Sequence, residues 1–221
     1  MISVQDYNDQ VTLWPAEGRF ILAHYDDLSV IVYQAYRVEI AEYAIKKGYF
    51  GGPFSYSRMS WIKPNFLWMM YRSGWGTKPG QEMTLALRLR RSFFDDMLRG
   101  AVQSSFVQDL YPTRADWQVA VRSSEVRVQW DPDHDPRGEK LSRRAIQLGL
   151  RGSVLEDFGC KELLEVIDMT DFVKEQRVRA NTKDFAGLKT PRERVYIPAD
   201  CSICEKLGLN KREAQQKVER K

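Results

Sequence analysis

The sequence predicts a single mixed α+β domain over residues 1–200, with a mostly antiparallel sheet, split or continuous, and flanking helices. Segments rich in β-branched, aromatic or alternating apolar residues outnumber helical segments, and short polar turns typical of hairpins join several of them. The sequence has no regular strand–helix–strand rhythm and no internal repeat, which argues against a doubly wound parallel sheet.

The first expected elements are a hairpin and a helix. Strand-forming residues fill 19–25 and 30–36, and the polar connection 26–29 suits a tight turn. A helix is expected over 37–47, because apolar residues recur there at helical spacing and Gly48 stands where a C-terminal cap belongs.

The later elements follow the same criteria. In 83–91, Met83 and three leucines alternate with small or charged residues, so we expect a strand with the leucines on one face. After residue 180 the sequence is polar, and we expect irregular chain there. Further strands are expected at 125–130, 144–150 and 163–169, and helices at 92–100, 116–123 and 170–179.

Composition excludes several classes of protein. Charged residues make up 29% and hydrophobic residues 43%, values ordinary for a globular domain. No apolar run approaches the ~20 residues of a membrane span, and the N-terminus lacks the basic start and apolar stretch of a secretory signal. We therefore expect a cytoplasmic protein with no membrane partner.

The formal net charge of +4 is concentrated in residues 211–221, where five Lys or Arg accompany two Glu. The remainder of the chain is nearly neutral, whereas binding of duplex nucleic acid usually requires a broad basic face. We expect residues 201–221 to form a polar basic tail that is poorly ordered beyond Leu209.

The cysteines and histidines do not form a strong metal motif. Cys201 and Cys204 have C-x-x-C spacing, but zinc would need two more ligands from one further cysteine and two histidines. His134 lies in an acidic segment, 131–138, that could hold a divalent cation weakly or simply be a solvated turn. We predict reduced thiols, a solvated turn and no metal.

Residues 58–75 combine large apolar rings with cationic side chains. Pro64 suits the first turn of a helix that runs to about Tyr71 and stops near Gly74. Helical spacing then gives a core stripe of Phe66, Met69 and Met70 and a cavity stripe of Trp61, Asn65, Trp68 and Arg72.

Two interpretations of this segment stay open. In one, rings of the segment stack on a flat ligand while Lys63, Arg72, Arg58 and the free amides of the first helical turn bind an anion. In the other, the segment is an ordinary amphipathic helix with tryptophan in the core and arginine extending to solvent. We favour the anion site.

Three polar residues on predicted strands are further candidates. His24 ends a strand and could act as a base or bind a ligand hydroxyl, or simply be hydrogen-bonded there. Gln34 and Gln147 lie among apolar neighbours, where a buried amide needs partners from a ligand or from neighbouring backbone. The sequence shows no glycine-rich nucleotide loop, zinc-protease motif or hydrolase elbow.

A family resemblance is carried by five stretches, 24–27, 31–36, 58–75, 126–132 and 144–150. Together they resemble the domain-of-unknown-function family numbered 4291, over about residues 15–198. The Trp-Ile-Lys-Pro block within the third stretch is specific. The family's name assigns no activity.

The order of the first elements is also similar to the opening of ADP-ribosyltransferase-like domains, which bind NAD across a split antiparallel sheet. That resemblance implies a polar strand residue for the ribose, an aromatic ring for nicotinamide and cations for the diphosphate. The sequence departs from the common His-Tyr-Glu pattern, since only Glu125 and Asp131 are candidates for the late acid. The predicted site residues are His24, Gln34 and Tyr36 for catalysis, and Arg58, Trp61, Lys63, Trp68, Tyr71, Arg72 and Gln147 for binding NAD.

Three functions follow from these patterns. We expect an NAD- or nucleotide-binding protein, and more specifically an ADP-ribosyltransferase-like enzyme that moves ADP-ribose to an unknown acceptor. The alternative is a non-catalytic module that binds a nucleotide or single-stranded nucleic acid by stacking on Trp61 and Trp68. The third is an interaction protein whose Trp-rich block is only core.

Overall fold

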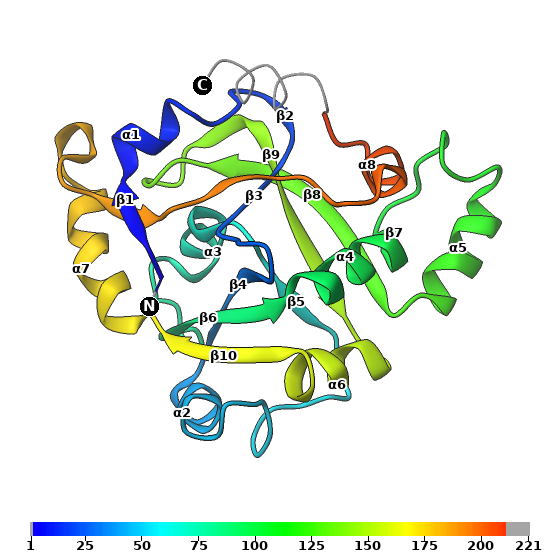
Figure 1. Ribbon diagram of the computed structural model, residues 1–221, viewed down its shortest axis with the longest axis horizontal. Helices are drawn as coiled ribbons and strands as arrows, with labels where there is room; N and C mark the ends of the chain where they lie inside the picture. Colours follow the sequence, from blue (N-terminus) through cyan, green and yellow to red (C-terminus); the bar gives the residue numbers. More distant parts are fainter. Residues whose placement is uncertain (1, 211–221) are drawn as a thin grey trace.

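The structure is a computed structural model that describes residues 2–210 (Figure 1). Helices and mostly antiparallel strands form one α+β domain, so the predicted fold class is confirmed. The elements in chain order are β1 (Val4–Asp6), α1 (Tyr7–Val11), β2 (Gly18–Arg19), β3 (Ile21–Ala23), β4 (Ser29–Tyr36), α2 (Val38–Lys47), β5 (Ser60–Ile62), α3 (Phe66–Ser73), β6 (Met83–Arg90), α4 (Arg91–Gly100), β7 (Val102–Gln103), α5 (Arg114–Ser123), β8 (Val126–His134), β9 (Lys140–Leu150), α6 (Gly152–Cys160), β10 (Leu163–Asp168), α7 (Thr170–Ala180), η1 (Lys183–Phe185), β11 (Lys189–Pro191), β12 (Arg194–Tyr196) and α8 (Cys201–Leu207).

Two sheets form the centre of the domain. In the first, β6 lies between β4 and β10, and in the second, β9 pairs with β8, β5 and β2. All pairings are antiparallel except β2 with β9 and β7 with β8. The sheets meet where Tyr33 of β4 exchanges backbone hydrogen bonds with Lys63, just after β5. The central strands therefore form two sheets and not one continuous sheet, and Lys63 lies where the two sheets meet.

Strand β4 separates two cores. Val30 and Val32 face the larger core, whereas Ile31 and Tyr33 face the smaller one, as the two-residue period of a strand requires. The leucines of β6 lie on one strand face, as predicted from their alternation, and this face packs in the larger core. Phe66, Met69 and Met70 of α3 pack in the smaller core, so the core stripe predicted for this helix is confirmed.

The predicted hairpin over 19–36 forms only at its turn. The Asp26 carboxylate accepts a hydrogen bond from the Ser29 amide, and Tyr25 bridges to Val30. Beyond the turn, β3 pairs with β12 instead of β4. The local turn signal was correct, but a distant strand supplied the pairing partner.

The C-terminal part of the described chain differs from the prediction. We expected irregular chain after residue 180, but β11 pairs with β1 and β12 pairs with β3. Helix α8 falls in the expected tail, yet Ile203 and Leu207 lie on one helical face and are buried in the larger core. The basic part of the expected tail, 211–221, lies outside the described residues.

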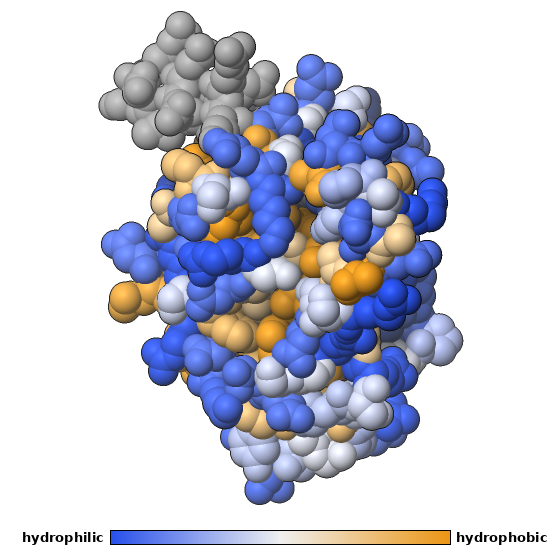
Figure 2. All heavy atoms as spheres, turned by 90° about the vertical axis from the view of Figure 1, so that its right-hand side faces the viewer, coloured by the Kyte–Doolittle hydropathy of each residue, from blue (hydrophilic) through white to orange (hydrophobic). Residues whose placement is uncertain are grey.

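Helix α5 stands at the edge of the domain (Figure 1) and has no buried residue. The face that carries it is mostly hydrophilic, with apolar side chains gathered towards its middle (Figure 2). Among the helices of residues 2–210, none has the length and apolar character to cross a bilayer.

Candidate functional site

A pocket of about 550 Å³ lies at the C-terminal end of β4. Its walls come from that strand end, the loop before β5, β5 itself, α3 and the loop that precedes β6. The pocket brings together six of the predicted site residues, Gln34, Tyr36, Arg58, Trp61, Lys63 and Arg72.

Positive charge dominates the pocket wall. Arg37, Arg58, Lys63 and Arg72 line it, and the described lining residues include no carboxylate. Among the described residues, Arg37 is the one of these four cations with an ion pair, with 3.6 Å between its Nε and Glu39 Oε2 at the surface. A concave surface with this charge attracts anions, and arginine forks suit phosphate in particular.

Lys63 is the most deeply placed of these cations. Its side chain is 5% exposed, and its ammonium donates to the Trp61 carbonyl at 3.4 Å. Burial, followed by the charge of Arg72, lowers the pKa of Lys63 to about 8, although Asp131 acts in the opposite direction. Within residues 2–210 Lys63 has no ion pair, and a buried cation without one is costly. The pocket is thus suited to an anion that would complete this site.

A neutral polar network lies beside Lys63. Gln34 donates to Ser60 Oγ at 2.7 Å and to the Trp61 carbonyl at 3.1 Å, and its own oxygen accepts from the Tyr36 hydroxyl. Burial raises the pKa of Tyr36, so its phenol stays protonated and acts as a donor. Gln34 and Lys63 share the Trp61 carbonyl, which places the amide and the ammonium side by side.

Trp61 reaches the pocket from a strand and not from the predicted helical stripe. It lies in β5, opposite Gly149 of β9. A Cβ at position 149 would lie 2.9 Å from the Trp61 ring, so only glycine leaves room for the indole. The predicted place of Trp61 on the helical stripe was wrong, because α3 begins at Phe66, with Asn65 as its N-cap, and does not extend back to residue 61.

Two members of the predicted cavity stripe, Asn65 and Trp68, are structural. Asn65 Oδ1 accepts from the Trp68 amide at 2.7 Å, and Glu193 accepts from the Phe66 amide at 2.7 Å. These first-turn amides are therefore occupied by protein groups, and our expectation that they bind an anion was wrong. Burial keeps the pKa of Glu193 well above its ordinary value.

The Trp68 and Tyr71 rings stack within the protein. Trp68 is 4% exposed, with its ring centroid 5.3 Å from Tyr71 and 5.1 Å from His134. Tyr71 also stacks on His134, at 3.6 Å. Neither Trp68 nor Tyr71 lines the pocket, so stacking of a pocket ligand on them is not supported.

The acidic segment 131–138 is partly buried, contrary to the expected solvated turn. His134 is 2% exposed beneath the Tyr71 ring. Asp133 is 1% exposed and forms an ion pair with Arg143 at 2.7 Å. The segment is extended here because β8 continues to His134 and pairs with β9.

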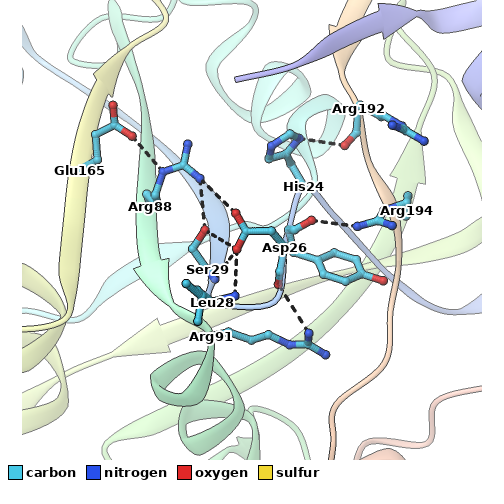
Figure 3. Close-up of polar contacts among 10 residues, drawn as sticks. His24, Asp26, Leu28, Ser29, Arg88, Arg91, Glu165, Arg192 and Arg194 are labelled. Carbon is cyan, nitrogen blue, oxygen red and sulfur yellow. Dashed lines mark hydrogen bonds and ion pairs between the residues drawn. The ribbon is translucent and has the colours of Figure 1, made fainter. Parts of the chain in front are cut away.

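His24 is not among the pocket residues and lies near the start of β4, where its carbonyl accepts from the Ile31 amide. Figure 3 shows its polar surroundings. Its Nδ1 is 2.9 Å from the Arg192 carbonyl, and burial lowers its pKa. The surrounding charges are largely engaged with one another, as when Arg88 donates to Glu165 at 2.9 Å and approaches Asp26 at 3.9 Å. His24 is thus a hydrogen-bonded histidine at a strand end, which agrees with the simpler of the two interpretations given for it from the sequence.

Gln147 and the two candidate acids are also outside the pocket wall. Gln147 donates to Asp131 at 2.7 Å, and Gln129 donates to the other oxygen of the same carboxylate at 2.8 Å. Glu125 accepts from Ser153 at the start of α6. Asp131 therefore influences Lys63 only through its charge, and Glu125 has a structural role.

Several pocket residues were not predicted from the sequence, among them Arg37, Ser60 and Met69. Arg37 follows Tyr36 directly at the end of a predicted strand, a position that could have suggested it. Met69 was assigned to the core and is indeed 3% exposed, but it also lines the pocket.

A model of one protein family, described as Domain of unknown function (DUF4291), matches residues 20–196. The chain belongs to this family. The DUF4291 match includes every residue that lines the pocket. A search of curated proteins found no match. Since the description of DUF4291 assigns no activity, the function must be argued from the pocket itself.

Proposed function

We propose that this DUF4291 domain binds a nucleotide through its diphosphate in the basic pocket, with NAD as the ligand, and transfers ADP-ribose to an acceptor. The observation that carries the proposal is Lys63, a buried ammonium without an ion pair among the described residues, beside Arg72 and facing a pocket without carboxylates. An anionic ligand would supply the missing charge partner.

Different pocket residues would contact the phosphates, the base and the ribose of the ligand. Arg72 and Arg58 can form bidentate contacts with phosphate oxygens, and Lys63 adds a buried point charge. Trp61 lines the pocket and can stack on a flat base, and the hydroxyls of Ser60 and Tyr36 can contact a ribose. When bound, NAD supplies an ADP-ribosyl group and nicotinamide as the leaving group.

Calorimetry with NAD tests the proposal directly. We expect saturable heat at low salt, weaker binding at 0.3 M salt because exposed cations are screened, and release of nicotinamide when an acceptor is present. Absence of both heat and nicotinamide would refute the proposal. Binding of NAD and ADP without nicotinamide release would favour the non-catalytic nucleotide-binding alternative. In that alternative the ligand would stack on Trp61, since Trp68 does not line the pocket.

Affinity for NAD is expected to fall as pH rises above about 8. Below that pH Lys63 is an ammonium that attracts phosphate, and a bound anion raises its pKa further. Above pH 8 the free protein must take up a proton to bind, so the dissociation constant should rise by up to about tenfold per pH unit. Calorimetry from pH 6.5 to 9.5 measures this, and Lys63→Met should flatten the profile.

His24→Ala is expected to leave NAD affinity within about twofold of the unmodified protein, because His24 lies outside the pocket. Arg58→Ala is the matched comparison, since Arg58 is an exposed cation on the pocket wall. It should weaken binding about fivefold to tenfold. If His24→Ala had the larger effect, the ligand would bind near the cluster of Figure 3.

A further inference from the structure

Lys63 has a combination of burial and access that the binding of phosphate does not require. Its side chain is 5% exposed, yet it lines the pocket. Two hydrogen bonds with Tyr33 fix the backbone of Lys63, since the Tyr33 amide donates to the Lys63 carbonyl at 2.7 Å and the Lys63 amide donates to the Tyr33 carbonyl at 3.2 Å. A buried, positioned amine that faces a pocket has the placement of a nucleophile.

We propose that Lys63 is a nucleophilic amine that forms an imine with aldehydes that carry a phosphate group. The inference goes beyond the proposed function, because it concerns a covalent reaction of Lys63 that needs no NAD. The pocket that holds the amine also holds the cations that would orient such a substrate.

Burial and the charge of Arg72 enlarge the neutral fraction of Lys63 in the empty pocket. Arg72 from α3 opposes the ammonium, Asp131 from β8 favours it, and burial is the largest influence. With a pKa of about 8, the neutral fraction of Lys63 at pH 7.5 is on the order of 100-fold larger than the neutral fraction of an exposed lysine. Only the neutral amine has the lone pair that attacks a carbonyl carbon.

The pocket wall separates the two ends of the proposed substrate. Arg58 and Arg72 are exposed on the wall and can bind the phosphate, which leaves Lys63 free to react in its neutral fraction. Gln34 shares the Trp61 carbonyl with Lys63 and lies beside the amine, and the Ser60 hydroxyl, which accepts from Gln34 and can still donate its own proton, is also on the wall. A hydroxyl donor near the amine suits the carbonyl oxygen of an aldehyde.

The reaction balances without an oxidant or reductant. The nitrogen lone pair of Lys63 forms a bond to the aldehyde carbon, and the carbonyl oxygen takes up a proton. The resulting hydroxyl then leaves as water with the second amine hydrogen, and a carbon–nitrogen double bond remains. Protonation of this imine would place a positive charge where the lysine ammonium was.

Pyridoxal 5′-phosphate, an aldehyde with a phosphate, is the probe for this reaction. The full chain is incubated with it at pH 7.5 and reduced with borohydride, and the labelled peptides are mapped by mass spectrometry. We expect Lys63 to be the main labelled lysine in the unmodified protein, and its labelling relative to exposed lysines to fall at least about tenfold with pyridoxal, which lacks the phosphate. Lys63→Arg should remove this label, whereas Lys46→Arg, at an exposed position on α2, should not.

The outcomes separate this inference from the proposed function. Labelling spread over exposed lysines, or the same preference for Lys63 with pyridoxal, would overturn the imine proposal even if NAD binds. Labelling of Lys63 that NAD blocks supports both proposals. Labelling of Lys63 in a protein that shows no heat with NAD supports the imine and refutes the proposed function.

Discussion

Replacing Lys63 with methionine is expected to weaken NAD binding about tenfold to 100-fold and, at the same time, to stabilise the folded domain. Binding is lost because the buried charge partner of the diphosphate is gone. Stability rises because burial holds the pKa of Lys63 near 8, below its ordinary value, so at neutral pH the folded state carries an ammonium that the unfolded chain solvates better. The expected gain is about 1–3 kcal/mol, since methionine fills similar space without a charge.

Calorimetry and denaturant unfolding at pH 7 measure the two effects. Lys46→Met is the matched control, because Lys46 is exposed and should change neither property appreciably. A Lys63→Met variant that is less stable would show that Lys63 supports the fold. If the Lys63→Met variant bound NAD with unchanged affinity, Lys63 would not contribute to NAD binding.

Trp68→Ala is expected to lower the free energy of unfolding by about 3–5 kcal/mol, the usual cost of removing a buried tryptophan. Trp68 is 4% exposed and stacks with both Tyr71 and His134. Its amide also donates to the capping Asn65. Removing the indole therefore leaves a cavity beneath His134 and loosens the packing of α3.

Denaturant unfolding followed by circular dichroism measures this loss, with Tyr71→Ala as the comparison. Tyr71 is 38% exposed, so its removal should cost clearly less. At temperatures where the Trp68→Ala variant is still folded, its NAD affinity should stay within about threefold of the unmodified value. If the Trp68→Ala variant were stable and bound NAD tenfold more weakly, Trp68 would contribute to ligand binding.

The parts of the fold that the sequence predicted are those with strong local periodicity. The leucine alternation of β6 and the Gly48 cap of α2 depend on residues close together in the chain, and both appear in the structure. The cationic pocket was also predictable in part. Lys63, Arg58 and Arg72 stood out because charged residues are costly among so many large apolar ones, and the structure brings them to one wall.

The errors have a common physical cause, which is pairing between distant segments. Whether Trp61 belongs to a helix or a strand is decided by β9, more than 80 residues away in the chain. The N-terminus of α3 is satisfied by Glu193, 127 residues from Phe66. His24 is held by the backbone of Arg192. No local pattern in the sequence could reveal these partners.

A crystal structure of the chain with NAD tests the central claim most directly. The diphosphate should lie between Lys63 and Arg72, within hydrogen-bonding distance of Lys63 Nζ, with one flat ring of NAD against Trp61. Density for NAD at the cluster of His24 and Arg88, or a pocket that stays empty at saturating NAD, would contradict the claim.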